Sequence, residues 1–303
     1  MYHSISRPIH YKVFITVVTL LCLTVQYTSA TIYPPTAKIV PRKQGRYQYI
    51  VVPPTDTTQM FISADGKHPL VISLHGKSLS GSEISALTKY GTIAALNRGM
   101  RLPTYVIAPQ CPSGQGWSPD KIMEVVNEVT QQYPIDTTRI YVLGMSMGGY
   151  GTFDLIGTYP NKIAAAVAMC GGGKERMASE IAKVPLWVIH GSSDVDVPVT
   201  QSRRMVAAVC AKNKDMCYYT ELPRVGHSAL AESYNHLKLY DWLLTHSRKP
   251  SDVATPGVAN KPPSYSRADF GWLKYTNGDK QRSVVKKRSK HKHSKKRRRR
   301  TRR

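Results

Sequence analysis

Beyond its first thirty residues, this chain of 303 residues lacks any apolar run long enough to cross a bilayer. It is also poor in cysteine: four cysteines follow position 30, and none of their spacings is that of a structural metal site. The sequence therefore predicts no membrane-spanning helix after residue 30 and no resident metal, and no motif in it indicates a cofactor.

The four cysteines after residue 30 are Cys111, Cys170, Cys210 and Cys217. Cys210 and Cys217 lie on either side of a turn predicted around residues 213–215, so a small disulfide between them is one prediction. Two unpaired, half-buried thiols are the alternative. Cys111 and Cys170 follow different predicted strands, and the sequence does not indicate whether they meet.

Acidic residues are scarce, 19 against 43 Lys and Arg, which gives a formal net charge of +24. The excess is local, because twenty Lys or Arg stand against three Asp from Arg248 onward, whereas residues 31–247 carry only +5. Residues 249–303 are therefore predicted to form a disordered, strongly basic tail. Such a tail suits a salt-sensitive attraction to polyanions or anionic surfaces, and a solvated tail without a partner is the alternative.

Residues 1–30 have the order of a secretory signal. Arg7 and Lys12 occur without an acid, an apolar stretch covers 13–25, and small residues stand at 28–30. The stretch is short for a bilayer anchor, so cleavage is the favoured interpretation, and the bulky Leu21 disfavours lipid attachment at Cys22. We expect a secreted or periplasmic protein, which the tail could hold at the cell envelope.

Between these ends the chain alternates strand-type and helix-type segments. Residues 31–46 are interpreted as a proline-rich lead-in and residues 47–248 as one catalytic domain. Strands are predicted at 47–52, 69–74, 105–108, 139–143, 163–169, 186–189 and 217–222, and helices at 119–133, 152–159, 199–212 and 230–244. This alternation predicts a mostly parallel, open α/β sheet with helices on both faces, and no gap between elements is long enough for a cap domain.

The most informative motif is the octapeptide Gly-Met-Ser-Met-Gly-Gly-Tyr-Gly at residues 144–151. It lies between a predicted strand and a predicted helix, where a serine within G-x-S-x-G forms the nucleophile elbow of a hydrolase. Glycines two residues before and after the serine let the strand and helix pack closely. Ser146 is therefore the predicted nucleophile.

A serine hydroxyl becomes a good nucleophile when a base removes its proton and a third group orients that base. His227 lies between the last strand and the last helix and is the predicted base. Asp194, after the strand at 186–189, is the predicted acid, with Asp196 as its competitor and a role in bracing the turn as the alternative for Asp196. His75 and His190 also end strands, but each precedes a glycine and is predicted to shape a loop.

Acyl transfer also needs N–H donors aimed at the developing oxyanion. The backbone of Met147, directly after the nucleophile, is predicted to supply one donor. The backbone of Lys77, in the loop after the strand at 69–74, is predicted to supply the other.

Taken together, these motifs resemble one family. In chain order they are Leu74-His75-Gly76, Pro109-Gln110-Cys111-Pro112 with Trp117, residues 144–151, His190-Gly191 to Val197-Pro198, and Gly226-His227. The order is similar to that of secreted bacterial α/β-hydrolases described as predicted peptidases, phospholipase/carboxylesterase-like proteins or feruloyl-type esterases. Over about residues 47–247, this resemblance implies the α/β-hydrolase fold and a triad of Ser146, Asp194 and His227. Lys77 and Ser78 depart from the small residues often found after His-Gly in the family.

The predicted function is a secreted serine carboxylesterase acting on acetyl or cinnamoyl esters, including esters on a polysaccharide. Trp117 and Gln110 are candidates for the substrate pocket, and a plain core position is the alternative for Trp117. A serine peptidase with the same triad is the enzymatic alternative. A polyanion-binding envelope protein with a vestigial hydrolase domain is the alternative from another class.

Overall fold

The computed structural model describes residues 33–56, 61–248 and 261–265. The predicted signal at 1–30 lies outside the described residues, as does most of the basic tail at 249–303, so both stay predictions. None of the helices in the described ranges is long and apolar enough to span a bilayer.

The described residues form a single sheet whose strands lie in the order β1-β2-β4-β3-β5-β6-β7-β8. The strands are β1 (Lys38–Val40), β2 (Gln48–Val52), β3 (His68–Leu74), β4 (Tyr105–Gln110), β5 (Ile135–Met145), β6 (Ala165–Met169), β7 (Leu186–Gly191) and β8 (Cys217–Leu222). β2 pairs antiparallel with both of its neighbours, β1 and β4. All other neighbouring strands, from β4 through β3 and β5 to β8, pair parallel. The chain reverses its direction of travel across the sheet between β3 and β5, which is where ligands bind in open α/β sheets.

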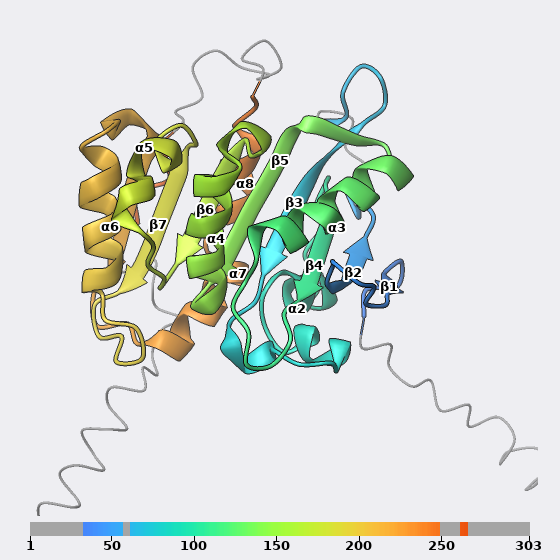
Figure 1. The fold of residues 1–303 in the computed structure, drawn as a ribbon. Helices are drawn as coiled ribbons and strands as arrows, with labels where there is room; N and C mark the ends of the chain where they lie inside the picture. The colour runs from blue at the N-terminus through green and yellow to red at the C-terminus, as the bar shows by residue number, and fades with distance from the viewer. Residues whose placement is uncertain (1–32, 57–60, 249–260, 266–303) are drawn as a thin grey trace, which may run out of the picture. The chain divides into compact units, whose positions relative to one another are not determined.

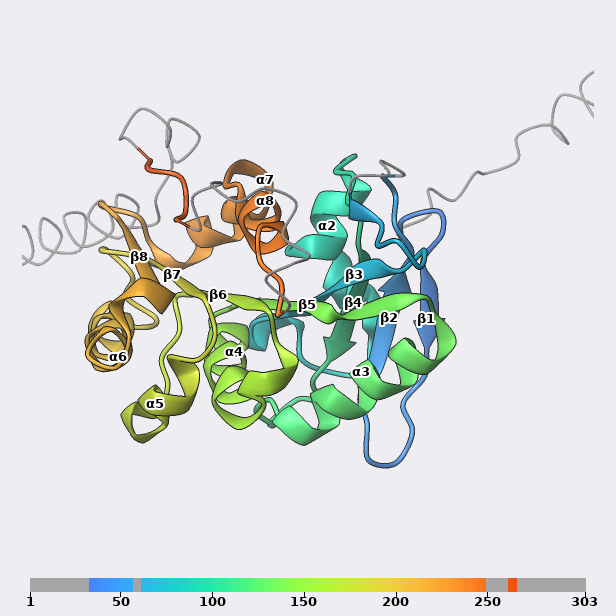
Figure 2. The same ribbon diagram turned by 90° about the horizontal axis from the view of Figure 1, so that it is seen from above.

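Helices cover both faces of the sheet (Figures 1 and 2). The helices are α2 (Thr92–Asn97), α3 (Pro119–Gln132), α4 (Met147–Thr158), α5 (Ala178–Ile181), α6 (Thr200–Cys210), α7 (Ser233–His236) and α8 (Leu239–Leu244). Figure 2 shows α3, α4, α5 and α6 on one face, and α2, α7 and α8 on the other. The predicted fold class, a mostly parallel α/β-hydrolase sheet, is therefore confirmed.

Strand β3 illustrates how alternate side chains build two apolar layers. Leu70, Ile72 and Leu74 are buried in the layer beneath α3 and α4, whereas Val71 is buried in the layer beneath α2 and α8. A parallel strand covered on both faces must be apolar on both, which accounts for its continuous apolar sequence. Helix α3 begins as predicted, because the Ser118 hydroxyl accepts a hydrogen bond from the Lys121 N–H at 3.4 Å.

Four segments differ from the sequence-based expectation. The lead-in contains a strand, β1, that pairs with β2, and neither α2 nor α5 was predicted. The closing helix expected over 230–244 is wrong, because it is broken into a 3₁₀ segment at His227–Glu232, α7 and α8. The break is at Leu237, whose extended backbone (φ −94°, ψ 147°) ends α7 while its side chain stays buried.

All four cysteines of the described residues are free thiols. The predicted disulfide between Cys210 and Cys217 is therefore absent from this structure, which has the alternative arrangement of two thiols. The Cys210 sulfur lies 3.8 Å from the carbonyl oxygen of Cys217. Cys210 is half-buried and Cys217 is buried.

One short part of the predicted tail packs on the domain. The ring of Tyr265 stacks on that of Trp187, with centroids 6.1 Å apart and planes at 9°. Its hydroxyl accepts a hydrogen bond from the Lys238 N–H at 2.9 Å. Residues 261–265 therefore belong with the folded domain rather than with the basic segment that follows them in sequence.

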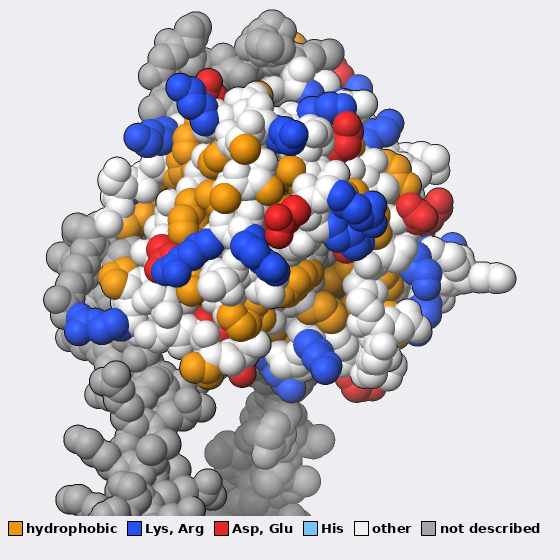
Figure 3. Space-filling view, turned by 60° about the vertical axis from the view of Figure 1, so that its left-hand side comes forward, with side chains coloured by type: hydrophobic (Ala, Val, Ile, Leu, Met, Phe, Trp, Pro, Cys, Tyr) orange, Lys and Arg blue, Asp and Glu red, His pale blue; other side chains and the backbone are white. Residues whose placement is uncertain are grey.

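The described domain carries charges of both signs on the face shown in Figure 3. Lys and Arg side chains there are interspersed with Asp and Glu, and apolar atoms lie between them. Ion pairs such as Arg203–Glu221 and Lys174–Asp154 join neighbouring elements. This mixed surface agrees with the small net charge of residues 31–247.

Candidate active site

Ser146 lies at the tight turn between β5 and α4, in a conformation that non-glycine residues rarely adopt (φ 59°, ψ −120°). The flanking glycines permit this turn. A Cβ on Gly144 would overlap the Gly148 carbonyl, and a Cβ on Gly148 would overlap the Leu74 carbonyl. The backbones of β3, β5 and α4 thus meet closely beneath the serine, as a nucleophile elbow requires.

Three side chains from three different loops form one hydrogen-bonded series. The His227 Nε2 lies 2.9 Å from the Ser146 Oγ, and its Nδ1 lies 2.7 Å from the Asp194 Oδ2. Since a carboxylate only accepts, Nδ1 carries the proton, and Nε2 accepts from the serine hydroxyl. Ser146 follows β5, Asp194 follows β7 and His227 follows β8, so all three lie at the carboxyl edge of the sheet.

The Asp194 carboxylate is fully covered and has several donors. Its Oδ1 accepts from the Asp196 and Val197 N–H groups at 3.0 and 2.9 Å, and its Oδ2 lies 3.3 Å from the His190 Nε2. Burial raises the pKa of this carboxyl, but the hydrogen bonds from His190, His227 and Val197 together lower it by more than burial raises it. The pKa therefore falls well below its usual value. Asp194 is therefore ionised at neutral pH.

This arrangement separates the two acid candidates. Asp194 contacts His227, and it also braces the turn through Oδ1, the role that the sequence analysis gave to Asp196. Asp196 contributes its backbone N–H and is exposed. His190, expected to shape a loop, is fully buried, and its Nε2 also contacts the Val197 carbonyl at 3.0 Å.

The two predicted oxyanion donors are both first residues of helical segments. Met147 begins α4, and Lys77 begins the 3₁₀ segment Lys77–Leu79. The first N–H groups of a helix have no partner within it, so both are oriented donors. Gly76 lies against the nucleophile, since a Cβ on Gly76 would be 3.3 Å from the Ser146 Cβ.

Tyr90 lies beside this loop, and the sequence analysis did not identify it. Its hydroxyl accepts from the Gly76 N–H at 3.2 Å and lies 3.1 Å from the Ser78 Oγ. No motif marks Tyr90, because it lies in an irregular segment between the 3₁₀ segment Ile84–Thr88 and α2. Only the tertiary fold brings its hydroxyl to the backbone that precedes Lys77.

Cys170 is a second neighbour that the sequence analysis left without a role. It is fully buried directly after β6, with an unusual φ of 39°. Burial, and after it the negative charge of Asp194, raises the pKa of the thiol well above its usual value. At neutral pH the group is therefore a neutral thiol and not a competing nucleophile.

The two pocket candidates lie in the interior. The Trp117 side chain, 8% exposed, donates to the His75 carbonyl at 3.2 Å and packs edge-on against Tyr47. Gln110 is 0% exposed, and its amide donates to the Leu79 and Glu83 carbonyls at 2.8 Å. The burial of Trp117 agrees with the core position that was its alternative, and Gln110 joins the loops that surround it. A role for either residue in the substrate pocket stays a prediction.

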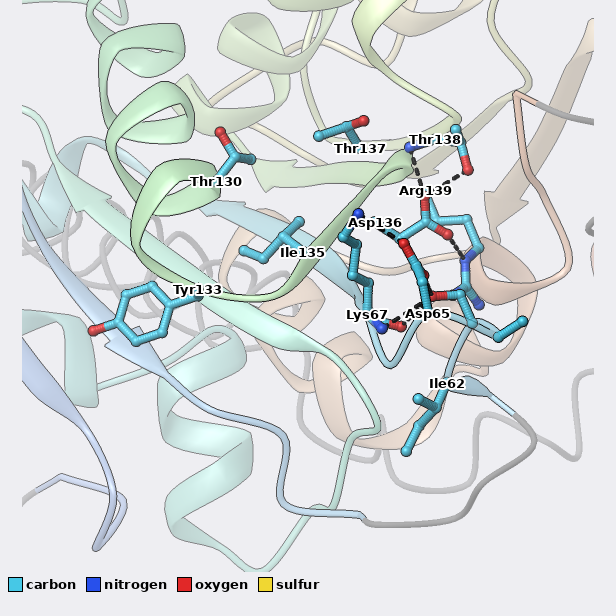
Figure 4. A pocket seen from close by; sticks show the side chains of 12 residues that line it. Ile62, Asp65, Lys67, Thr130, Tyr133, Ile135, Asp136, Thr137, Thr138 and Arg139 are labelled. Carbon is cyan, nitrogen blue, oxygen red and sulfur yellow. Dashed lines mark hydrogen bonds and ion pairs between the residues drawn. The ribbon is translucent and has the colours of Figure 1, made fainter.

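A cavity of about 650 Å³ lies at the opposite edge of the sheet from Ser146 (Figure 4). It is lined by residues at the amino ends of β3 and β5, among them Lys67, Ile135 and Asp136. Its charged side chains are already matched, because Asp136 pairs with Arg139 and Asp65 pairs with Lys67, each at 2.7 Å. Because it lies at the amino ends of these strands and Ser146 follows the carboxyl end of β5, the cavity is separate from the site at Ser146.

Comparison with known proteins finds similarity to a hydrolase family and to an esterase of known structure. The family model described as Phospholipase/Carboxylesterase matches residues 118–241, which include Ser146, Asp194 and His227. A crystal structure of a thermostable esterase is similar, with a TM-score of 0.59 and 28% identity, and the match covers 70% of this chain and 63% of the esterase.

Two curated relatives match shorter parts of the chain. The bifunctional acetylxylan esterase/xylanase XynS20E of Neocallimastix patriciarum is 31% identical over 134 residues, which are 42% of this chain and 19% of that protein. Poly(3-hydroxyalkanoate) depolymerase C of Paucimonas lemoignei is 28% identical over 123 residues, which are 34% of this chain and 28% of that protein. The chain thus spans less than a third of the length of either relative.

Proposed function

We propose that this α/β-hydrolase of the esterase and peptidase type is a serine carboxylesterase, in which Ser146, His227 and Asp194 act as nucleophile, base and acid. The observation that carries the proposal is the series from Ser146 Oγ through His227 to Asp194, with contacts of 2.9 and 2.7 Å. Its place at a strained strand-to-helix turn is that of a nucleophile in this class of fold.

In the proposed first half-reaction, the Ser146 oxygen attacks the ester carbonyl carbon while its proton passes to His227 Nε2. Asp194, accepting from Nδ1, holds the ring in the required tautomer and stabilises its positive charge. The Met147 and Lys77 N–H groups stabilise the oxyanion that forms. The alcohol then leaves with the proton from Nε2, and the acyl group remains on Ser146.

In the second half-reaction, His227 Nε2 takes a proton from a water molecule, whose oxygen attacks the acyl-enzyme carbonyl. The tetrahedral intermediate collapses, the proton returns to the Ser146 oxygen, and the carboxylic acid is released. No group other than these residues and water is needed to balance the reaction.

For the substrate, we propose an acetyl or cinnamoyl ester carried on a polysaccharide. The names of the two curated relatives, an acetylxylan esterase and a polyester depolymerase, support an ester on a polymer. The segment between β6 and β7 supports an open site, because Ala178, Ile181 and Val184 are buried in the core beneath α4 rather than placed over Ser146. The apolar stretch at 13–25 supports export to the compartment where such polymers occur.

The test compares the wild-type protein with Ser146→Ala, using p-nitrophenyl acetate and an acetylated xylan. We expect the substitution to reduce kcat by roughly 10⁴-fold to 10⁶-fold and to abolish labelling by a fluorophosphonate probe, with an unchanged melting temperature. Ser113→Ala, at an exposed serine whose hydroxyl donates to the Ser80 carbonyl rather than to His227, is the matched control and should keep both properties. Equal esterase activity in the wild type and Ser146→Ala would refute the assignment.

The choice of substrate distinguishes a carboxylesterase from a peptidase with the same triad. We expect ester hydrolysis and no measurable cleavage of aminoacyl-p-nitroanilides by the same preparation. Faster turnover of the anilides than of the esters would favour the peptidase and leave the assignment of Ser146 intact.

A further inference from the structure

The Cys170 thiol is a buried sulfur beside the reaction site that the proposed reaction does not use. Its position is fixed by the backbone on both sides. The Cys170 N–H donates to the Ile189 carbonyl at 2.8 Å, and the carbonyl of the preceding Met169 accepts from the Ser146 N–H at 2.9 Å. The thiol therefore cannot move far from the nucleophile without disturbing β6 and the elbow.

Three potential metal ligands meet at this point. The Cys170 sulfur, a carboxylate oxygen of Asp194 and a ring nitrogen of His227 all lie within 4.8 Å of one another. They follow three adjacent strands, β6, β7 and β8, so the parallel sheet brings them to one edge. Cys170 and Asp194 are buried, and the His227 side chain, 14% exposed, is the outermost of the three.

This set of donors selects the kind of ion. A thiolate, an imidazole and a carboxylate suit Zn²⁺ and its thiophilic analogue Cd²⁺, whereas Mg²⁺ and Ca²⁺ take oxygen ligands. Two ligand atoms on one tetrahedral zinc ion lie roughly 3.5 Å apart, given bonds of about 2.0 to 2.3 Å. None of the three separations therefore exceeds this spacing by more than about 1.3 Å, whereas the His227 Nδ1 and the Asp194 Oδ2, now 2.7 Å apart, must move apart if both bind the ion. Rotation of the partly exposed His227 ring is the least costly adjustment.

We propose that Cys170, Asp194 and His227 form an inhibitory site for one thiophilic divalent cation. Binding replaces the proton of the Cys170 thiol, which is released to solvent, by a metal–sulfur bond. His227 has one nitrogen on Ser146 and the other on Asp194. A metal on Nε2 displaces the Ser146 hydroxyl, whereas a metal on Nδ1 separates the ring from Asp194 and the ring proton moves to Nε2, so either mode breaks one link of the series. The bound protein is therefore inactive, and a chelator restores it.

Binding is measured first without relying on any activity. Ser146→Ala keeps all three ligands, and its titration with Cd²⁺ is followed by the ultraviolet absorption band of the cadmium–thiolate bond. We expect one equivalent of Cd²⁺ to produce the band, and Ser146→Ala/Cys170→Ser to lack it. When Cys210 and Cys217 are also replaced by serine, a band that survives the loss of Cys170 overturns the proposal.

The other thiols provide matched controls. Cys210 and Cys217 lie close together and could hold cadmium themselves, so the band must persist when both are replaced by serine in the Ser146→Ala background. It must also persist with Cys111→Ser, which changes another buried thiol. If a Cys170 variant does not fold, Ser146→Ala/His227→Ala provides the second test, with an expected loss of Cd²⁺ affinity of more than roughly tenfold. Unchanged affinity in that variant overturns the proposal.

A second measurement concerns activity and is independent of the first. We expect Zn²⁺ to inhibit the wild-type esterase reversibly, Mg²⁺ to have no effect, and Cys170→Ser to need more than roughly tenfold more Zn²⁺ for the same fractional inhibition. Equal Zn²⁺ sensitivity of Cys170→Ser and wild type contradicts the inhibitory role. If no ester is hydrolysed, the proposed function fails, while the cadmium titration still decides whether the site exists.

Discussion

At the scale of single residues, Asp194 and Asp196 stand two positions apart in one turn but have different surroundings. Asp194 is buried between His190 and His227, and Asp196 is exposed. Their amide variants therefore form a matched pair. We expect Asp194→Asn to lower kcat by roughly 10⁴-fold, because the amide favours the wrong His227 tautomer. Asp196→Asn should remain within about threefold of wild type, since an amide alters the tautomer only through direct contact with the histidine.

Steady-state kinetics with p-nitrophenyl acetate measure this difference, and circular dichroism verifies folding. A comparable loss in both variants would show that the turn as a whole matters rather than the contact with His227. A large loss only in Asp196→Asn would reverse the assignment of the acid.

His75 gives a prediction about stability. Burial lowers the pKa of His75 to about 4 from an ordinary value of 6.5, although the hydrogen bond that its Nδ1 donates to the Gly76 carbonyl raises the pKa by a smaller amount. Its Nε2 accepts a hydrogen bond from the Cys111 N–H, which also requires that this nitrogen carry no proton. The folded protein thus holds His75 neutral where the unfolded chain protonates it. Its contribution is complete above pH 6.5 and is lost as the pH falls toward 4, by about 3 kcal/mol in all.

Melting temperatures between pH 7 and pH 5 measure this contribution. We expect the wild type to lose stability over this interval, and His75→Gln to start lower but decline less steeply. Burial also lowers the pKa of His246, so His246 contributes to the pH dependence and the His75→Gln variant keeps part of the decline. The lowered pKa of Asp194 affects stability only below about pH 4, the ordinary pKa of an aspartate, and this range lies outside the interval measured. An equally steep decline in His75→Gln would contradict the prediction.

At the scale of elements, the loop from β3 into the 3₁₀ segment at Lys77–Leu79 depends on a close approach at Gly76. The Gly76 backbone is extended (φ −81°, ψ 171°), a conformation open to any residue. However, a Cβ there would lie 2.7 Å from the Tyr90 hydroxyl, so a larger residue displaces Tyr90, and glycine is favoured by space and not by dihedral angles.

We expect Gly76→Ala to lower kcat/KM by roughly 10-fold to 100-fold, because the Tyr90 hydroxyl must move and the Lys77 N–H moves with the loop. Gly76→Ala/Tyr90→Phe removes the overlapping oxygen and should recover part of the loss. The comparison needs both variants together with Tyr90→Phe alone. If the double variant is no better than Gly76→Ala, the collision with Tyr90 is not the cause.

Elements also show the limits of sequence patterns. Buried parallel strands such as β3 and the capped helix α3 were predicted, because a continuous apolar run and a Ser-Pro start are local signals. The break at Leu237 was not predicted, because helical spacing of apolar residues continues through it, at Leu237, Tyr240 and Leu243. In addition, neither a glycine nor a proline marks the break. There the burial of Leu237 and Tyr240 beneath the sheet decides the backbone.

At the scale of the whole molecule, the folded domain and the basic segment meet in sequence near Tyr265. Residues 266–303 hold seventeen Lys or Arg against two Asp. We expect truncation after Tyr265 to leave kcat/KM and the melting temperature unchanged and to abolish salt-dependent retention on an anionic matrix. Retention that survives truncation would place the interaction in the domain.

A shorter truncation, after Arg248, also removes Tyr265 and its stacking on Trp187. We expect this variant to melt several degrees lower than the one ending at Tyr265, since an aromatic pair contributes about 1 kcal/mol beyond its buried area. Tyr265→Ala in the full chain is the control and should reproduce the decrease. Identical melting temperatures for the two truncations would mean that Tyr265 adds no stability.

The sequence alone determined the alternation of strands and helices, the elbow at Ser146 and the order in which Asp194 and His227 follow it. These features are local or ordered along the chain, so the period of apolar residues and the positions of glycines express them directly. The catalytic roles themselves remain predictions for the kinetics proposed above. The tertiary structure decided what Asp194, Trp117, Gln110, Tyr90 and Cys170 contact. Those contacts join residues far apart in the chain, and only the packing of the parallel strands brings them to one edge of the sheet or buries them beneath it.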